Sequence, residues 1–138
     1  NSCDNMNICQ NCDFNKTCYS VNSYKNYKIS EYGTVKGENK MMAEIYARGP
    51  IACDIDSTML ETYKGGIIPF IKNETNVDHV IAIVGWGQEN NNGSITKYWI
   101  GRNSWGSYWG ENGWFRVEKG LNNLMIESNC AWAVPIIN

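Results

Sequence analysis

Histidine, proline and phenylalanine are scarce in this chain, with one, three and three copies in 138 residues. The chain also lacks an apolar run of about 18 residues, which excludes a membrane-spanning helix. Its net charge of −2 gives no electrostatic basis for binding nucleic acid or an anionic membrane. No methionine or apolar signal segment opens the sequence, so we expect a processed or truncated product whose targeting signal is out of view.

The chain does contain enough apolar residues for one folded domain. Apolar residues make up 43% of the sequence and charged residues 19%, proportions typical of a globular rather than a disordered protein. At this length a single domain can bury a substantial core.

Six cysteines are many for this length, and four of them crowd into the first eighteen residues. They are Cys3, Cys9, Cys12, Cys18, Cys53 and Cys130. Disulfides are the favoured interpretation. The Cys9-x-x-Cys12 spacing leaves zinc binding and a redox dithiol open as alternatives. Against zinc, no second such pair follows and His79 is remote in sequence; against a redox site, no βαβ pattern surrounds the pair.

Three Asn-x-Ser/Thr triplets are candidate sites of N-glycosylation. They begin at Asn15, Asn73 and Asn92. Each is a weak signal alone, because such triplets arise by chance in an asparagine-rich chain. Together with the cysteines they favour an oxidising compartment, either lysosomal or secreted.

One helix is clearly expected, over residues 38–48, where Gly49-Pro50 ends an amphipathic pattern. The apolar stripe of this helix consists of Met41, Met42, Ile45 and Tyr46. Residues 1–23 lack periodicity and are expected to form a cross-linked loop region, followed by an extended segment over 24–35.

Several short apolar segments at hairpin spacing predict strands. Residues 79–84 are wholly apolar after His79, which is typical of a strand buried on both faces. Gly85-Trp86-Gly87 is expected to end that strand, and residues 88–94 to form a polar hairpin loop. Further strands are expected at 51–55, 95–102, 114–119 and 131–136.

This pattern predicts an α+β fold, a small antiparallel β-barrel or sheet with one flanking helix. We expect residues 1–30 to form a disulfide-rich lead-in region and residues 31–138 to form the β-barrel domain.

His79 and Asn103 are the candidate catalytic residues. Antiparallel pairing of their strands would bring the two together, because both flank the same hairpin. A histidine accepts and returns a proton, and an amide holds the imidazole in one tautomer without adding charge. Trp105 and Trp109 follow Asn103 in a glycine-rich stretch, and they would shield that hydrogen bond from water. The alternative is a structural histidine among core aromatics.

The order of these motifs resembles the second half of the papain-family cysteine peptidases over residues 30–137. The matching positions are Gly49-Pro50, Tyr63-Lys64-Gly65-Gly66-Ile67, Asp78-His79-Val80, Gly85-Trp86-Gly87, Tyr98-Trp99-Ile100 and the run from Arg102 to Trp114. The spacing Cys3-x5-Cys9-x2-Cys12-x5-Cys18, with Tyr32-Gly33 and residues 40–47, resembles the cathepsin X (also called cathepsin Z) branch, a group of lysosomal carboxypeptidases.

The resemblance implies a papain-like fold of which this chain supplies the right-hand, β-barrel lobe, over residues 31–138. It implies that His79 is the general base and acid, that Asn103 orients it, that Trp105 covers the pair and that Trp109 walls the primed side. The nucleophilic cysteine of the family lies in a left-hand helical lobe, in a setting that this sequence does not contain. We therefore expect the isolated chain to be inactive, and we expect no cofactor and no metal.

The resemblance also implies disulfides Cys12–Cys18 and Cys53–Cys130, with Cys3 and Cys9 bonded to the left-lobe half as a partner. It places Asp54 and Asn129 approximately at a specificity pocket, where an acidic Asp54 would favour a basic side chain; a solvent-facing aspartate is the alternative.

Peptide hydrolysis, as half of a peptidase of the carboxypeptidase type, is the leading hypothesis for function. A catalytically inactive binding module, either a pseudoprotease or a fragment, is the second. A zinc-stapled structural domain is the third.

Overall fold

The computed structural model describes residues 2–72 and 76–137, so the expected glycosylation site at Asn73 lies outside the described residues. The chain divides into two compact units. One consists of the N-terminal residues up to Lys28 and the chain's last residues from Ile136, and the other spans Ile29–Pro135. The division falls two residues before the expected boundary, and the C-terminal residues group with the first unit.

The first unit contains short elements that the sequence did not predict: α1 (Asn5–Ile8), β1 (Gln10–Cys12) and β2 (Cys18–Ser20). These elements have no apolar periodicity; a side-chain cap and a disulfide stabilise them. The Asp4 carboxylate caps α1 by accepting a hydrogen bond from the Asn7 N–H at 3.0 Å. The antiparallel pair β1–β2 is closed by a disulfide between Cys12 and Cys18, which face each other in register.

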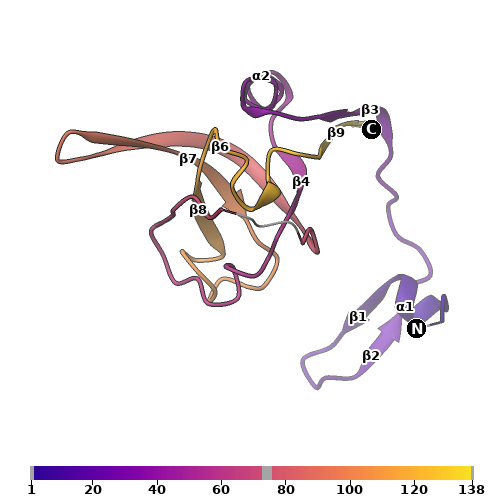
Figure 1. Cartoon of the computed structure of the whole chain (residues 1–138). Helices are drawn as coiled ribbons and strands as arrows, with labels where there is room; N and C mark the ends of the chain where they lie inside the picture. The colour runs from indigo at the N-terminus through magenta and orange to yellow at the C-terminus, as the bar shows by residue number, and fades with distance from the viewer. Residues whose placement is uncertain (1, 73–75, 138) are drawn as a thin grey trace. The chain divides into compact units, whose positions relative to one another are not determined.

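The second unit is built on one seven-stranded sheet with the strand order β3-β9-β4-β6-β7-β8-β5 (Figure 1). The strands are β3 (Ile29–Val35), β4 (Ile51–Ile55), β5 (Ile67–Ile68), β6 (His79–Asn91), β7 (Ser94–Arg102), β8 (Trp114–Glu118) and β9 (Cys130–Pro135). Every pairing is antiparallel except that of β5 with β8, so the expected antiparallel sheet is in fact mixed. At two residues, β5 is too short to leave a periodic signal.

Helix α2 (Glu38–Arg48) has the predicted bounds, and a 3₁₀ turn, η1 (Asn123–Met125), lies between β8 and β9. Met41 and Ile45 are buried and Met42 packs against the core, but Tyr46 is 88% exposed. The predicted stripe was therefore too wide, because a position five residues after Met41 is rotated by about 140° around a helix of 3.6 residues per turn.

The predictions for residues 85–94 were wrong, because β6 continues through Gly85-Trp86-Gly87 as far as Asn91. A register shift between Ile83 and Gly85 marks a bulge, beyond which pairing with β7 resumes. The hairpin turns on Asn92 and Gly93 alone, at φ values of 53° and 91°. Asn-Gly with two positive φ angles is the preferred two-residue hairpin turn. Figure 1 shows this hairpin reaching beyond the other strands of the unit.

The core lies against the sheet and α2. Its largest fully buried apolar side chains are Trp99, Phe115, Met41, Ile51, Ile55, Leu60, Ile83, Leu124, Ile126 and Val117. Phe115 on β8 faces Gly101 on β7, and a Cβ added at Gly101 would lie 2.3 Å from the Phe115 ring. The strand pairing at this point therefore requires a glycine.

Replacing Gly101 by alanine is expected to lower the free energy of unfolding by about 1–3 kcal/mol, because the new methyl group overpacks the core. Gly85→Ala is the matched control: Gly85 also lies in a strand, and nothing lies within 4 Å of a Cβ added there. Urea denaturation of the two variants checks the prediction. Equal losses at both positions would contradict it.

Candidate active site

His79 and Asn103 lie together at one end of the β6–β7 hairpin. His79 is the first residue of β6, and Asn103 directly follows the last residue of β7. Nε2 of His79 lies 2.9 Å from Oδ1 of Asn103. Asn103 is only 4% exposed, and its N–H donates to Gly113 O at 3.0 Å. The structure thus brings the side chains of the two candidate residues into contact, and the backbone hydrogen bond to Gly113 fixes the position of Asn103.

The hydrogen bonds of Asn103 determine the tautomer of the imidazole. Oδ1 of Asn103 also accepts a hydrogen bond from the Ser104 N–H at 2.8 Å. Because a backbone N–H can only donate, the shared amide atom is an oxygen, and Nε2 of His79 must carry a proton to bond to it. In the neutral ring, Nδ1 then keeps its lone pair and is available as a base.

Trp105 and Trp109 form an aromatic wall beside this pair. The Trp105 ring stacks on His79 with centroids 5.1 Å apart and planes 28° apart. Trp109 meets Trp105 edge to face at 5.4 Å, and its indole N–H donates to Leu60 O at 2.9 Å. Trp105 is half-buried and covers one face of the imidazole, so it limits the access of water to the hydrogen bond from that side.

Two contacts at this site were missed by the sequence analysis. Asp78 fixes the entry into β6, because its N–H donates to Ile55 O at 3.2 Å and its carboxylate accepts from the Ser57 N–H at 2.9 Å. Leu60 supplies the carbonyl that holds Trp109. The position of Asp78 beside His79 was a usable signal for the first contact, whereas a backbone carbonyl leaves no signal in a sequence.

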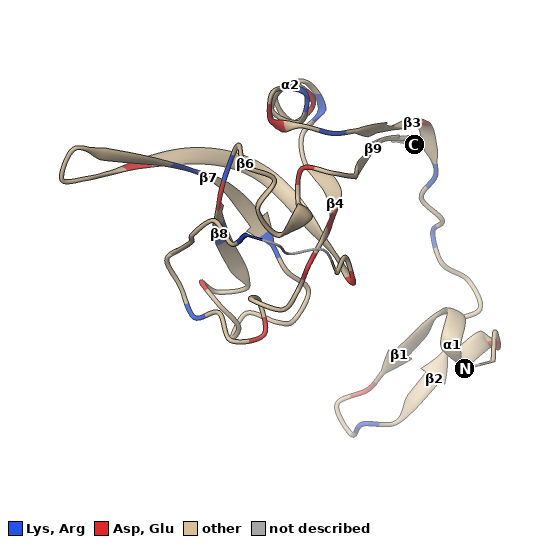
Figure 2. Ribbon diagram, in the orientation of Figure 1, with Lys and Arg blue, Asp and Glu red and all other residues tan. Residues whose placement is uncertain are grey.

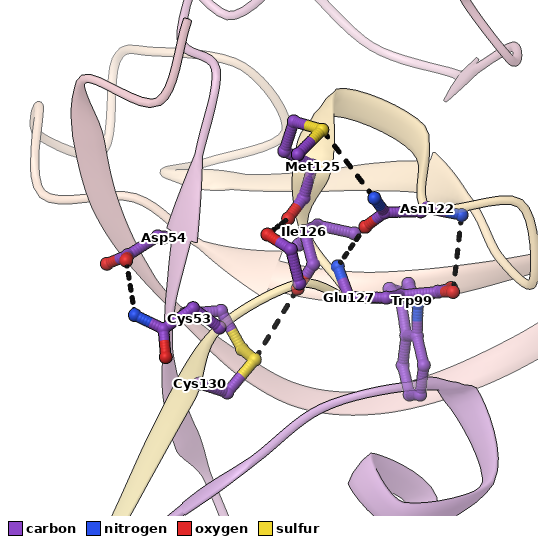
Figure 3. The surroundings of a disulfide bond; sticks show 10 residues. Cys53, Asp54, Trp99, Asn122, Met125, Ile126, Glu127 and Cys130 are labelled. Atoms are coloured by element: carbon purple, nitrogen blue, oxygen red, sulfur yellow. Dashed lines mark hydrogen bonds between the residues drawn. A yellow bond between two sulfur atoms is a disulfide. The ribbon is translucent and has the colours of Figure 1, made fainter. Parts of the chain in front are cut away.

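Asp54 and Asn129 are also brought together, by a hydrogen bond of 2.7 Å from the Asn129 amide to the Asp54 carboxylate. Asp54 on β4 pairs in register with Val80, the residue after His79. The carboxylate is partly buried and Asn129 is exposed. Figure 3 shows Asp54 beside the Cys53–Cys130 disulfide. The pair is therefore an accessible acidic feature near the histidine.

Four of the six cysteines form disulfides, namely Cys12–Cys18 and Cys53–Cys130. These are the pairings that the resemblance implied. Cys3 and Cys9 are free thiols. Cys9-x-x-Cys12 thus lacks the two thiols that the zinc and redox alternatives require. No group of three or more His, Cys, Asp and Glu side chains that could hold a metal occurs among residues 2–72 and 76–137.

Charges of both signs are spread along the chain, as Figure 2 shows. No helix in the described part of the chain has the length and apolar character needed to cross a membrane. The disulfides fit an oxidising compartment.

Comparisons with known proteins bear on the family and the fold of this chain. The family described as papain family cysteine protease matches residues 4–134. Cathepsin Z of Onchocerca volvulus is 46% identical over 98% of this chain and 45% of its own length, so the chain spans about half of that relative. Procathepsin L 3 of Tenebrio molitor has a TM-score of 0.66 and 32% identity over 78% of this chain and 36% of that one. Bromelain of Ananas comosus has a TM-score of 0.67 and 29% identity over 77% and 50%. The chain belongs to the papain family of cysteine proteases.

Proposed function

We propose that this chain is the C-terminal half of a cathepsin X-like cysteine peptidase and supplies its acid–base residues. A cysteine thiolate from outside the chain attacks the peptide carbonyl and forms a thioester acyl-enzyme. Nδ1 of His79 takes the proton of the cysteine thiol and gives it to the leaving amine. It then takes a proton from the water that hydrolyses the thioester, so that the thiolate leaves and the thiolate–imidazolium pair is restored. Asn103 holds the ring throughout, and Trp105 and Trp109 exclude water from one side.

The hydrogen bond between His79 and Asn103 carries this proposal. It fixes Nε2 as the protonated nitrogen and leaves Nδ1 for the reaction, which is the arrangement that a histidine needs to exchange a proton with a thiol.

The nucleophile belongs to a partner, the N-terminal left-lobe half of the same protease. The two cysteines in the unit of His79, Cys53 and Cys130, are bonded to each other and cannot attack a substrate. Cys3 is exposed and Cys9 is partly exposed, so both thiols are accessible for disulfides to that half. The isolated chain is therefore inactive.

Resemblance to the cathepsin X branch supports trimming of the carboxypeptidase type. The Asp54–Asn129 pair lies beside the residue that follows His79, so we assign it to a specificity pocket. A carboxylate at this position favours a basic side chain in the substrate.

Asn15 and Asn92 lie in exposed turns and are therefore accessible to glycosylation. Together with the two disulfides, they support a lysosomal or secreted location.

The test measures the intact mass of native material with and without reductant, together with peptidase activity. We expect a larger species that splits on reduction, turnover by that species, and no turnover by the pure 138-residue chain. A single 15.7 kDa species under both conditions, or a partner lacking a nucleophilic cysteine, would favour the binding-module alternative. Turnover by the pure chain would refute the proposed division of the catalytic residues.

A further inference from the structure

Two motifs outside the catalytic pair, Tyr63-x-Gly-Gly66 and the segment containing Glu111 and Arg116, meet in one network of hydrogen bonds. The Arg116 guanidinium donates to both oxygens of Glu111, from Nη2 at 2.8 Å and from Nε at 3.1 Å. The same carboxylate accepts from the Gly66 N–H at 2.9 Å. The Tyr63 hydroxyl donates to Gly66 O at 2.6 Å and accepts from the Arg116 N–H at 3.2 Å. We call these four residues the Glu111 joint.

The joint is a charge-assisted contact between the loop that contains Tyr63 and Gly66 and a distant part of the chain, in which Glu111 precedes β8 and Arg116 lies on it. The Arg116 guanidinium beside Glu111 lowers the pKa of that carboxyl below its ordinary value of 4.5, against an opposing effect of burial. Burial raises the pKa of Tyr63, so its hydroxyl stays protonated and able to donate. Gly66 has a φ of +88°, a conformation that favours glycine, so the backbone can present its N–H to the carboxylate.

Ring contacts connect the joint to the imidazole. Tyr63 packs on Trp109 with ring centroids 5.5 Å apart. The Trp109 indole also depends on the 57–66 segment, because Leu60 of that segment accepts its N–H. Trp109 contacts Trp105 at 5.4 Å, and Trp105 stacks on His79 at 5.1 Å. The backbone hydrogen bonds within 57–66 are short-range, from Leu60 N to Ser57 O and from Tyr63 N to Leu60 O. Backbone pairing with the sheet begins only at β5, directly after Gly66, so the side-chain contacts of the joint act where the segment reaches the sheet.

We propose that Glu111 and Arg116 are positioning residues for His79, acting through Tyr63, Trp109 and Trp105. The joint holds the 57–66 segment against the loop that follows β7, and this fixes the aromatic wall that sets the plane of the imidazole. This inference depends on the proposed function in one respect, the catalytic role of His79. The contacts that carry it are independent of any partner.

His79 is the only histidine, so a spectrum of the 138-residue chain contains a single set of imidazole resonances. Glu111→Ala removes the acceptor for both Gly66 and Arg116. We expect the His79 ring resonances to be displaced and the Trp109 indole N–H to exchange with solvent about tenfold faster, at temperatures well below unfolding. Glu111→Gln keeps an oxygen for the Gly66 N–H and should restore most of the native spectrum.

Glu44→Ala is the matched control. It breaks a bidentate Glu–Arg pair of the same chemistry on α2, between Glu44 and Arg48. His79 resonances that move no further in Glu111→Ala than in Glu44→Ala would overturn the inference. If Glu111→Ala does not fold, Arg116→Lys takes its place: it keeps the charge but loses the two-pronged contact, and an undisturbed imidazole would again overturn the inference.

Measurements of peptidase activity distinguish failure of this inference from failure of the proposed function. In the assembled two-chain peptidase, Glu111→Ala should lower kcat about tenfold with KM unchanged, because misplacing a catalytic group affects the transition state rather than substrate binding. A rise in KM with kcat unchanged would overturn the positioning role. Displaced His79 resonances in a protein without any peptidase activity would support the positioning and refute the proposed function.

Discussion

Replacement of His79 by alanine is expected to lower kcat/KM of the assembled peptidase by about 10⁴-fold. In the proposed mechanism the same ring protonates the leaving amine and activates water, so both chemical steps would lose their proton carrier. Substrate binding should change little, because the imidazole contributes to the transition state more than to the ground state. Steady-state kinetics on a peptide substrate measure the loss. Tyr46→Ala, at an exposed position on α2, is the control: a substitution outside the proposed site should leave kcat/KM unchanged.

Asn103→Ala distinguishes an orienting role from a purely structural one. Without Oδ1, neither tautomer of His79 is preferred, and ¹⁵N chemical shifts of the ring nitrogens should report a mixture. The fall in kcat should be smaller than for His79→Ala, because the ring remains present. A spectrum that still reports one Nε2-protonated form would contradict the assignment of Asn103 as the residue that sets the tautomer.

The parts of the fold that the sequence predicted best are those set by local patterns. Helix α2 begins and ends at the predicted residues because glycines lie on both sides of an amphipathic segment, and Gly37 and Gly49 adopt positive φ. The hairpin was misjudged because residues 88–91 are polar. They form a regular ladder at the exposed end of a ribbon, where a strand needs no apolar side chains. The Asn92-Gly93 pair was the overlooked signal.

The contact between His79 and Asn103 was predictable because hairpin topology alone brings the ends of β6 and β7 together. The Glu111 joint was not predictable in the same way. The contact between Glu111 and Gly66 joins positions 45 residues apart, and it depends on the path of the 57–66 segment and on the parallel strand β5. Neither carries a periodic signal. The sequence therefore showed the motifs that contain Gly66 and Glu111, but it did not predict that these residues are in contact.

Removing the Cys53–Cys130 disulfide is expected to have the largest effect on stability. The bond spans 77 residues, and closing a loop of that size stabilises the native state by about 4 kcal/mol through the entropy of the unfolded chain. Its position adds to its importance. Strands β3 and β9 join the rest of the sheet at only two register pairs among the described residues, Ala52 with Ala131 and Cys53 with Cys130.

The test replaces both Cys53 and Cys130 by alanine and measures urea unfolding, with Cys12 and Cys18 replaced by alanine as the matched pair. Both disulfides join residues that face each other on neighbouring strands, but the second spans only 6 residues and should contribute about 2 kcal/mol. The strand geometry is alike, but Cys53 and Cys130 are buried whereas Cys12 and Cys18 are exposed, so loop length and lost core packing both contribute to the expected difference. Equal losses would mean that local strand pairing, rather than the entropy of the long loop, sets the contribution of Cys53–Cys130. In that case β3 and β9 would be held mainly by their backbone hydrogen bonds and by the packing of α2.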